Sequence, residues 1–300
     1  MASTECDAAV DGVRVQLLPD TAGAPPERLQ QLVVDSRWNQ TIEDWALLLH
    51  AGRVYVASDA DAGIVASGAV LPMDALSASA MPSGEAASVA WISMILVKPS
   101  WRGRGLGRTV FERCLRHVQA EGRVAMLDAT PAGEALYRSF GFQVLWRLTR
   151  WRREARVADS TVAEPARGTL DRLLALDAEA LGFDRARVLR GLAERPGSRL
   201  VSADHAGALV RAGRSARHLG PMLACSDTVA AQLLASVAES DASALLIDVP
   251  DDRPSMQRTL EACGFRPERP FARMALATPG RDLPGGNTQL IHAIAGPEYA

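Results

Sequence analysis

A degenerate internal repeat constrains the fold of this chain more than any other feature. Residues 107–118, Gly-Arg-Thr-Val-Phe-Glu-Arg-Cys-Leu-Arg-His-Val, lie without gaps over residues 226–237. Farther along, Asp128 lies over Asp248, and a Gly-Phe pair recurs in the same relation. The offset stays near 120 residues, about the size of one small domain. We therefore expect two copies of one fold, the second of them diverged; chance matches between two unrelated α/β pieces are the alternative.

Hydrophobic periodicity predicts a similar order of elements in both copies. In the first copy, the predicted strands lie at 14–18, 54–58, 64–71, 90–97, 124–129 and 143–151, and the predicted helices at 26–34, 42–50, 106–121 and 132–140. In the second, the predicted strands lie at 199–202, 206–212, 244–248 and 271–277, and the predicted helices at 170–181, 187–192, 228–237 and 256–263. The polar stretch 154–166 has no clear period. We expect a first domain at residues 1–153, a linker at 154–166 and a second domain at 167–300.

Composition narrows the function classes. The 300 residues are 48% hydrophobic, and 33 Lys and Arg against 35 Asp and Glu leave a net charge of -2. This balance predicts no nucleic-acid partner and no binding to an acidic membrane surface. The longest apolar run, around 89–97, is far short of the roughly 20 residues that span a bilayer. Four scattered cysteines lack metal-ligand spacing, so we expect no metal and a cytoplasmic location.

The segment 97–108, Val-Lys-Pro-Ser-Trp-Arg-Gly-Arg-Gly-Leu-Gly-Arg, lies between an apolar strand pattern and an amphipathic helix pattern. Its glycines let the main chain approach a ligand closely. The N–H groups of the first helical turn, the helix dipole and three arginines favour an anion such as phosphate. A glycine-rich turn with solvated arginines is the structural alternative. A dinucleotide loop is less favoured, since Arg108 stands where G-x-G-x-x-G needs its third glycine, and the Walker Gly-Lys-Ser/Thr is missing.

These residues resemble the GNAT superfamily of N-acetyltransferases. Its signature Q/R-x-x-G-x-G/A after a V-x-P strand end matches Arg102-Gly-Arg-Gly-Leu-Gly107 after Val97-Lys-Pro99. The segment 135–142 looks like the fourth helix of that family, and element order is similar over 14–151. Residues 38–45 and 128–133 look like the two-domain acetyltransferases of the YitH/HolE type.

The resemblance implies tandem GNAT-like domains in an α/β (α+β) class, each a mostly antiparallel twisted sheet with splayed central strands flanked by helices. Acetyl-CoA, or another short acyl-CoA, would be the donor, and a primary amine of a small molecule the acceptor, with a monomer or homodimer as the assembly. Strands 92–97 and 124–130 would separate, and the pantetheine arm would pair with one of them. The expected CoA-binding residues are Ile95, Leu96 and Val97 for pantetheine and Arg102, Gly103, Arg104, Gly105, Leu106, Gly107 and Arg108 for the pyrophosphate.

The same resemblance points to Tyr137 as the general acid, because a phenol can protonate a departing thiolate; packing of a half-buried helix tyrosine is the structural alternative. The general base stays open. Many relatives carry a glutamate on the strand 91–97, which has none here. Ser93 acting through water, Asp128 and Thr130 are the candidates, although Asp128 would equally cap a helix. A main-chain N–H at the splay would stabilise the oxyanion.

Acceptor contacts are expected from Trp38, Asn39, Asp44 and Thr130. The second copy has Pro221, Ala224 and Ser226 where the first has Arg102, Gly105 and Gly107, and Leu260 where the first has Tyr137. We therefore expect no second catalytic centre; the second copy would wall the acceptor pocket or form an interface. The competing functions are a non-catalytic acyl-CoA-binding or regulatory module and, less favoured, a dinucleotide-binding protein.

Overall fold

The computed structural model describes residues 12–18, 26–76, 88–157, 165–203, 205–277 and 280–300. The start of the chain at 1–11, the segment 77–87 and the central part of the predicted linker, 158–164, lie outside the described residues.

The first half follows the predicted element order closely. Its elements are β1 (Val15–Leu18), α1 (Glu27–Asp35), α2 (Ile42–Ala51), β2 (Arg53–Asp59), β3 (Gly63–Met73), β4 (Val89–Val97), α3 (Leu106–Ala120), β5 (Val124–Ala129), α4 (Pro131–Ser139) and β6 (Gln143–Arg153).

The second half holds two strands that periodicity missed, β9 and β12. Its elements are α5 (Leu170–Leu181), α6 (Ala186–Ala193), β7 (Arg199–Ala203), β8 (Ala206–Arg211), β9 (Arg217–Ala224), α7 (Asp227–Ser240), β10 (Leu245–Pro250), α8 (Pro254–Ala262), β11 (Arg266–Leu276) and β12 (Ile291–Ala293). A Gly-Pro pair lies in the middle of β9, and proline normally argues against an internal strand. β12 has only three residues, too few for a periodic signal.

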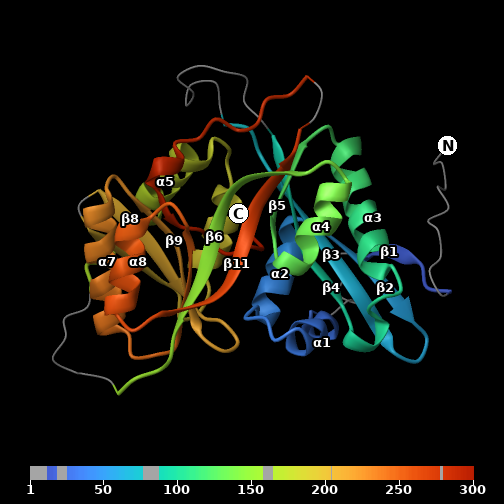
Figure 1. Ribbon diagram of the computed structural model, residues 1–300, viewed down its shortest axis with the longest axis horizontal. Helices are drawn as coiled ribbons and strands as arrows, with labels where there is room; N and C mark the ends of the chain where they lie inside the picture. Colours follow the sequence, from blue (N-terminus) through green and yellow to red (C-terminus); the bar gives the residue numbers. More distant parts are fainter. Residues whose placement is uncertain (1–11, 19–25, 77–87, 158–164, 204, 278–279) are drawn as a thin grey trace.

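All the strands join one sheet, in the order β1-β2-β3-β4-β5-β11-β6-β10-β9-β8-β7, with β12 beside β9 (Figure 1). Most neighbours are antiparallel; β4–β5 and β9–β10 are the parallel pairs among the described strands. The expected mixed, mostly antiparallel fold of tandem similar halves is confirmed. The two halves share a continuous sheet, which the sequence pattern did not foresee.

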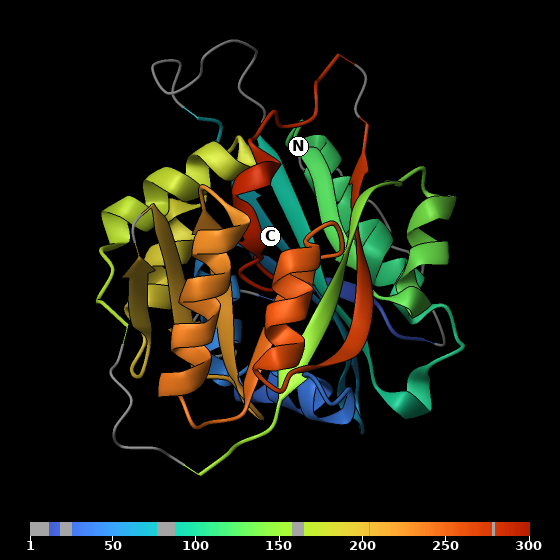
Figure 2. The same cartoon turned by 60° about the vertical axis from the view of Figure 1, so that its left-hand side comes forward.

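The last strands of the two halves are exchanged at the centre of the sheet. β11, from the second half, lies between β5 and β6, while β6, from the first half, lies between β11 and β10. Figures 1 and 2 show these two long strands running side by side through the middle of the molecule. Each half therefore completes its sheet with a strand of the other half.

Two matched ion pairs tie the exchanged strands in place. Asp248 of β10 accepts two hydrogen bonds from Arg150 of β6, both of 2.8 Å. Asp128 of β5 accepts two from Arg273 of β11, of 3.0 and 2.9 Å. In each pair the two residues are direct register partners. The repeated aspartate of the sequence thus holds the strand that arrives from the opposite half.

Helices cover both faces of the sheet (Figures 1 and 2). On one face, α1, α2, α5 and α6 share a single apolar core that runs across both halves. On the other face, α3 and α4 cover the first half and α7 and α8 the second, each pair over a separate core. The continuous core on one side makes the two halves one packed unit.

Candidate active site

The two central strands of the first half separate part-way along their length. β4 and β5 pair in parallel only at Val89, Ala90 and Trp91 of β4. β4 then continues to Val97 and β5 to Ala129 without pairing to each other. Main-chain groups of β4 beyond Trp91 are left facing a gap, as expected for splayed strands.

A bulge in β4 lies at this gap. Met94 has a left-handed backbone, with φ of 54°, and the pairing with β3 shifts register between Ser67 and Ala69. The Ser67 hydroxyl donates to the Met94 carbonyl oxygen at 3.0 Å. A bulge re-aims neighbouring groups, and here it lies beside the gap that β5 leaves.

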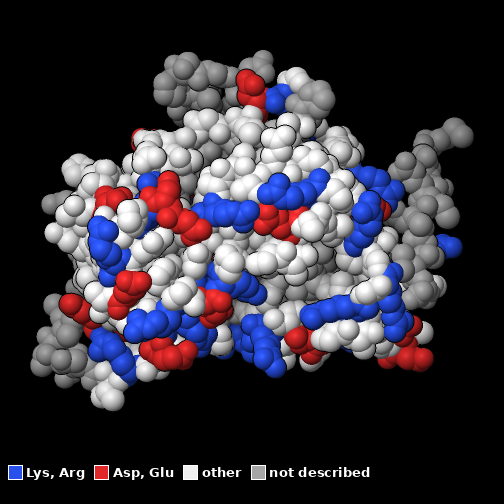
Figure 3. Space-filling view, in the orientation of Figure 1, with Lys and Arg blue, Asp and Glu red and all other residues white. Residues whose placement is uncertain are grey.

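The loop before α3 has the features of an anion site. Gly105 is the N-terminal cap of α3 and has φ of 85°, with open space where a side chain would begin. The main-chain N–H groups of Leu106, Gly107 and Arg108 have no acceptor within the described part of the chain. Figure 3 shows basic side chains over this loop, at the lower right, while the rest of that face mixes both signs. Free N–H groups, helix dipole and arginines together favour a phosphate group.

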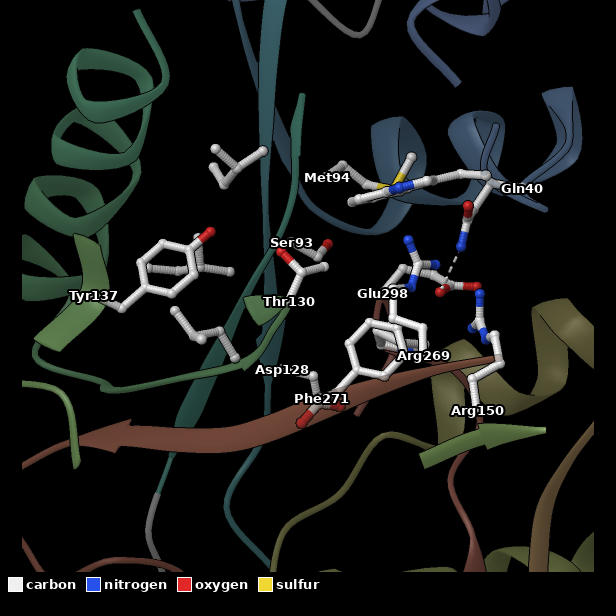
Figure 4. A pocket seen from close by; sticks show the side chains of 15 residues that line it. Gln40, Ser93, Met94, Asp128, Thr130, Tyr137, Arg150, Arg269, Phe271 and Glu298 are labelled. Carbon is white, nitrogen blue, oxygen red and sulfur yellow. Dashed lines mark hydrogen bonds between the residues drawn. The ribbon is translucent and has the colours of Figure 1, made fainter. Parts of the chain in front are cut away.

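Tyr137 lies on α4, below the gap. Its ring packs on Phe111, with centroids 4.7 Å apart, and on Phe142 at 6.3 Å. Burial raises the pKa of Tyr137 well above its usual value, so the phenol keeps its proton at neutral pH. Its hydroxyl makes no hydrogen bond with any described residue, and Figure 4 shows it directed toward the pocket that follows the gap.

One pocket connects Tyr137 to the exchanged strands. Ser93 and Thr130 lie between the Tyr137 end and a charged end (Figure 4). Ser93 is buried, and its hydroxyl has no partner among the described residues. The remaining lining residues are Trp38, Gln40, Ile92, Met94, Ile95, Leu127, Asp128, Arg150, Arg269, Phe271, Pro297 and Glu298.

The charged end of the pocket is built largely by the second half. Glu298, which follows β12, accepts from the Gln40 amide at 2.8 Å and from Arg211 at 2.9 Å. Burial raises the pKa of Glu298 despite the nearby Arg211 charge. The preceding Pro297 is held by its carbonyl oxygen, which accepts from the Trp91 indole at 2.9 Å. Pro297 and Glu298 therefore form one side of the pocket, and residues of β4 form another.

Two family models match the chain, and both are described as acetyltransferase (GNAT) domains. One matches residues 50–144, which include β4, the arginine loop and Tyr137, and the other matches residues 173–291. This protein belongs to the GNAT family and carries two GNAT domains in tandem. One match lies within each of the two copies that the internal repeat predicts.

Relatives agree with this assignment. The uncharacterized N-acetyltransferase YitH of Bacillus subtilis is 25% identical over 184 residues, a match that covers 58% of this chain and 65% of that relative. A putative acetyltransferase from Pyrococcus horikoshii shares the fold with a TM-score of 0.75 at 20% identity, covering 98% of both chains. A tandem GNAT protein from the clavulanic acid biosynthesis pathway aligns with a TM-score of 0.59 at 13% identity, over 90% of this chain and all of that one. Those two likenesses concern the fold alone.

In this tandem GNAT protein, the pocket brings together several predicted residues: Trp38, Ser93, Ile95, Asp128, Thr130 and Tyr137. Two predicted acceptor contacts lie elsewhere. The Asn39 side chain binds the loop of the second half, donating to the Ala216 carbonyl at 2.9 Å and accepting from the Ser215 main chain at 2.9 Å.

Asp44 is also engaged in structure. It accepts from the Thr41 main chain at 2.6 Å, from Arg195 at 2.6 Å and from the Tyr299 hydroxyl at 2.8 Å. Burial works against its charge, but Arg211 and Arg195 hold the pKa of Asp44 below its usual value. Its carboxylate therefore caps α2 and anchors the end of the chain, outside the pocket.

Asp128 lies at the pocket, but both of its oxygens are bound by Arg273. Its side chain has no exposed surface, and the Arg273 guanidinium lies over the rings of Trp91 and Trp146, at 4.7 and 4.4 Å. These contacts give Asp128 a structural task at the strand exchange. Thr130 lies at the N-terminal cap of α4, beside the pocket.

Sequence reasoning missed Gln40, Arg150, Arg269, Phe271, Pro297 and Glu298. For one of them a signal was present, since Arg150 lies inside the predicted strand 143–151, where a charged residue is uncommon. Arg269 precedes the predicted strand 271–277 and gave no such signal. Gln40 directly follows two residues that were singled out. Pro297 and Glu298 carry no local signal, because only the return of the chain end brings them to the pocket.

Among the described residues, no three His, Cys, Asp or Glu side chains gather as metal ligands would. Within the same part of the chain, no helix has the length and apolarity that crossing a bilayer requires.

Proposed function

We propose that this protein transfers an acetyl or other short acyl group from acyl-CoA to a primary amine of a small molecule. GNAT domains generally use acyl-CoA donors, and one observation carries the proposal further. The parallel pairing of β4 and β5 stops at Trp91; β4 continues toward the arginine loop, and its residues 92–95 beyond the separation line the pocket. A donor with a phosphate end and a thin, amide-bearing arm fits that path.

The residues present suit this donor. The free N–H groups that begin α3, with Arg102, Arg104 and Arg108, would hold the pyrophosphate. The unpaired edge of β4 at Ile95, Leu96 and Val97 would pair with the pantetheine amides, and the thioester would supply an activated acyl carbon between Ser93 and Tyr137. The donor site then belongs to the first domain, proposed as residues 1–153, with its sheet completed by a strand of the second domain, 167–300.

In this proposal the acceptor amine attacks the thioester carbon directly. A C–N bond forms, the C–S bond breaks, and Tyr137 donates its proton to the departing sulfur. The amine gives up one proton, through Ser93 and water, and the phenol is restored from solvent. A buried, protonated Tyr137 is suited to this because its proton is present at every working pH below its raised pKa.

Tyr137→Phe tests the mechanism. We expect kcat for CoA release, measured with a panel of primary amines, to fall about 10²- to 10⁴-fold, since that is the usual contribution of a general acid, while CoA affinity is unchanged. Tyr55→Phe is the matched control, because Tyr55 is also buried but lies on β2, outside the pocket. Full activity of Tyr137→Phe would remove the assigned acid. Tight CoA binding with no turnover on any amine would favour a non-catalytic acyl-CoA-binding module.

A further inference from the structure

Arg269 is a charged side chain without a hydrogen-bond or ion-pair partner among the described residues. It lies on β11 and lines the pocket, with its guanidinium 5.9 Å from the Trp38 ring and 5.0 Å from the Phe271 ring. Its Nε is buried without a partner, and the side chain makes no hydrogen bond or ion pair with any described residue. Burial, together with the nearby Arg150 charge, lowers the pKa of Arg269.

Four other arginines of this region are paired with carboxylates. Each has a carboxylate within hydrogen-bond distance, in the pairs Arg150–Asp248, Arg211–Glu298, Arg273–Asp128 and Arg195–Asp44. Arg269 has no such carboxylate, so this region carries one positive charge that the described residues leave unbalanced. A charge taken from water without a partner is costly, and a ligand with one negative charge would offset that cost.

Arg150 stands directly across from Arg269. The two are register partners on β6 and β11, and residues so placed have their side chains on one face of the sheet. Nε and Nη2 of Arg150 donate hydrogen bonds to Asp248, whereas Nη1 makes no hydrogen bond with any described residue. Like charges directly opposite each other repel. An anion between them would turn that repulsion into charge-assisted hydrogen bonds, and arginine forks match a carboxylate.

Acceptors lie beside this cationic pair. The Gln40 side-chain oxygen is buried and unpartnered, and the Glu298 carboxylate lies next to it. Figure 4 shows Gln40, Glu298, Arg150 and Arg269 grouped at one end of the pocket, with Ser93 and Thr130 between them and Tyr137. A ligand with N–H donors and one anionic group meets complementary partners at that end.

We propose that the acceptor is an amino-carboxylate, a primary amine whose own carboxylate binds Arg269 and the free Nη1 of Arg150. This inference rests on the proposed function and names its substrate class. A carboxylate is favoured over a phosphate because it matches the single unbalanced charge. With its carboxylate held at the arginine pair, the amine is directed toward Ser93, between the two ends of the pocket.

The test compares amino acids with their decarboxylated amines, for example phenylalanine with phenethylamine, and adds O-phosphoethanolamine as the phosphate arm. We expect wild-type kcat/KM to be about 10- to 100-fold higher for the carboxylate-bearing partner, the size of a hydrogen bond to a charged group. Arg269→Gln should raise KM by a similar factor with little change in kcat, and should erase the preference. Arg266→Gln, an exposed arginine of the same strand outside the pocket, is the matched control.

The outcomes separate the two proposals. Equal use of both members of each pair, or a preference for O-phosphoethanolamine, overturns the carboxylate site and leaves the acyltransferase standing. If no amine is acetylated, thermal shift decides: stabilisation by amino acids in wild type, absent in Arg269→Gln, supports the site without the reaction. Stabilisation that is equal in both proteins, or absent from both, overturns the site.

Discussion

In the first half β4 and β5 pair at three residues and then separate, and in the second half β9 and β10 pair at two residues and then separate. The first gap opens onto the pocket with Ser93 and Tyr137. The second gap is filled by the chain itself. β12 pairs with β9 at Leu223 and Met222, and the main-chain N–H of Ile294 donates to the carbonyl of Asp248 on β10 at 3.0 Å.

The filling segment takes the place that the pantetheine arm is proposed to take in the first half. Counted from the point of separation, Met222 and Leu223 of β9 correspond to Ile95 and Leu96 of β4. Pro221 therefore matches Met94 on the strand, and the ungapped sequence comparison was wrong to place it over Arg102. His292 of β12 also contacts Asp227 at the start of α7, at 3.0 Å. A strand of protein and a pantetheine arm offer similar amide hydrogen bonds. The comparison teaches that the gap proposed to hold pantetheine in the first half has a counterpart in the second half that serves as a structural joint, without a change of fold.

The matched ion pairs are the strongest test of the comparison, because they hold the exchanged strands. We expect Asp248→Asn and Asp128→Asn each to lower the free energy of unfolding by about 3–5 kcal/mol, the usual result of leaving one buried charge unpaired. Asp248→Asn should cost more, since His218 also binds that carboxylate at 3.0 Å. Urea denaturation measures both.

The control for this pair is Glu154→Gln, whose partner Arg152 lies on β6 and whose own side chain is exposed. Its unfolding should not change measurably. If Asp128→Asn behaved like Glu154→Gln, the matched pairs would not be what secures the exchange.

The open and filled gaps predict one CoA per chain. Gly105→Glu places a carboxylate where the phosphates are proposed to lie, so CoA affinity should fall at least about 100-fold, or about 2.7 kcal/mol. Gly197→Glu is matched, because Gly197 has φ of 79° and equally open space but lies in an exposed turn of the second half. Titration calorimetry measures affinity and stoichiometry. Two CoA per wild-type chain would contradict the filled second gap.

The residues at which the two gaps begin, Trp91 in the first half and His218 in the second, should differ in their contribution to the pH dependence of stability, which is a smaller effect. Burial, with the charge of Arg211, lowers the pKa of His218 from 6.5 to about 4. Between pH 4 and pH 6.5, His218 therefore binds a proton in the unfolded chain but not in the folded chain. Stability from this group is complete above pH 6.5 and is lost as the pH falls toward 4, by about 2–3 kcal/mol.

His218→Gln should remove this loss of stability at low pH. The measurement is the unfolding free energy of wild type and of His218→Gln at pH 7 and at pH 4; the fall between the two pH values should be smaller in the variant. Parallel curves for the two proteins would show that the buried imidazole is not responsible. No counterpart is expected at Trp91, because its indole does not titrate.

Local patterns in the sequence were enough to determine several features of this protein. Helical spacing from Leu106 and the glycine cap at Gly105 specify α3 and its exposed N–H groups, which depend on residues only a few positions apart. The repeat of Asp128 at Asp248 predicted two copies, and both copies are present. Tyr137 could be proposed from the sequence because it belongs to a continuous motif on one helix.

Only the tertiary structure decided which strand lies beside which. The sequences of β6 and β11 are typical of ordinary final strands, and no local pattern in either predicts that they exchange places. Pairing across the sheet depends on register and burial, which involve residues far apart in the sequence. The same choice puts Arg269 opposite Arg150 and brings Glu298 to a pocket that begins at β4. Charge balance in a buried region depends on every neighbour at once, and for that reason the unpaired arginine became visible only in the folded chain.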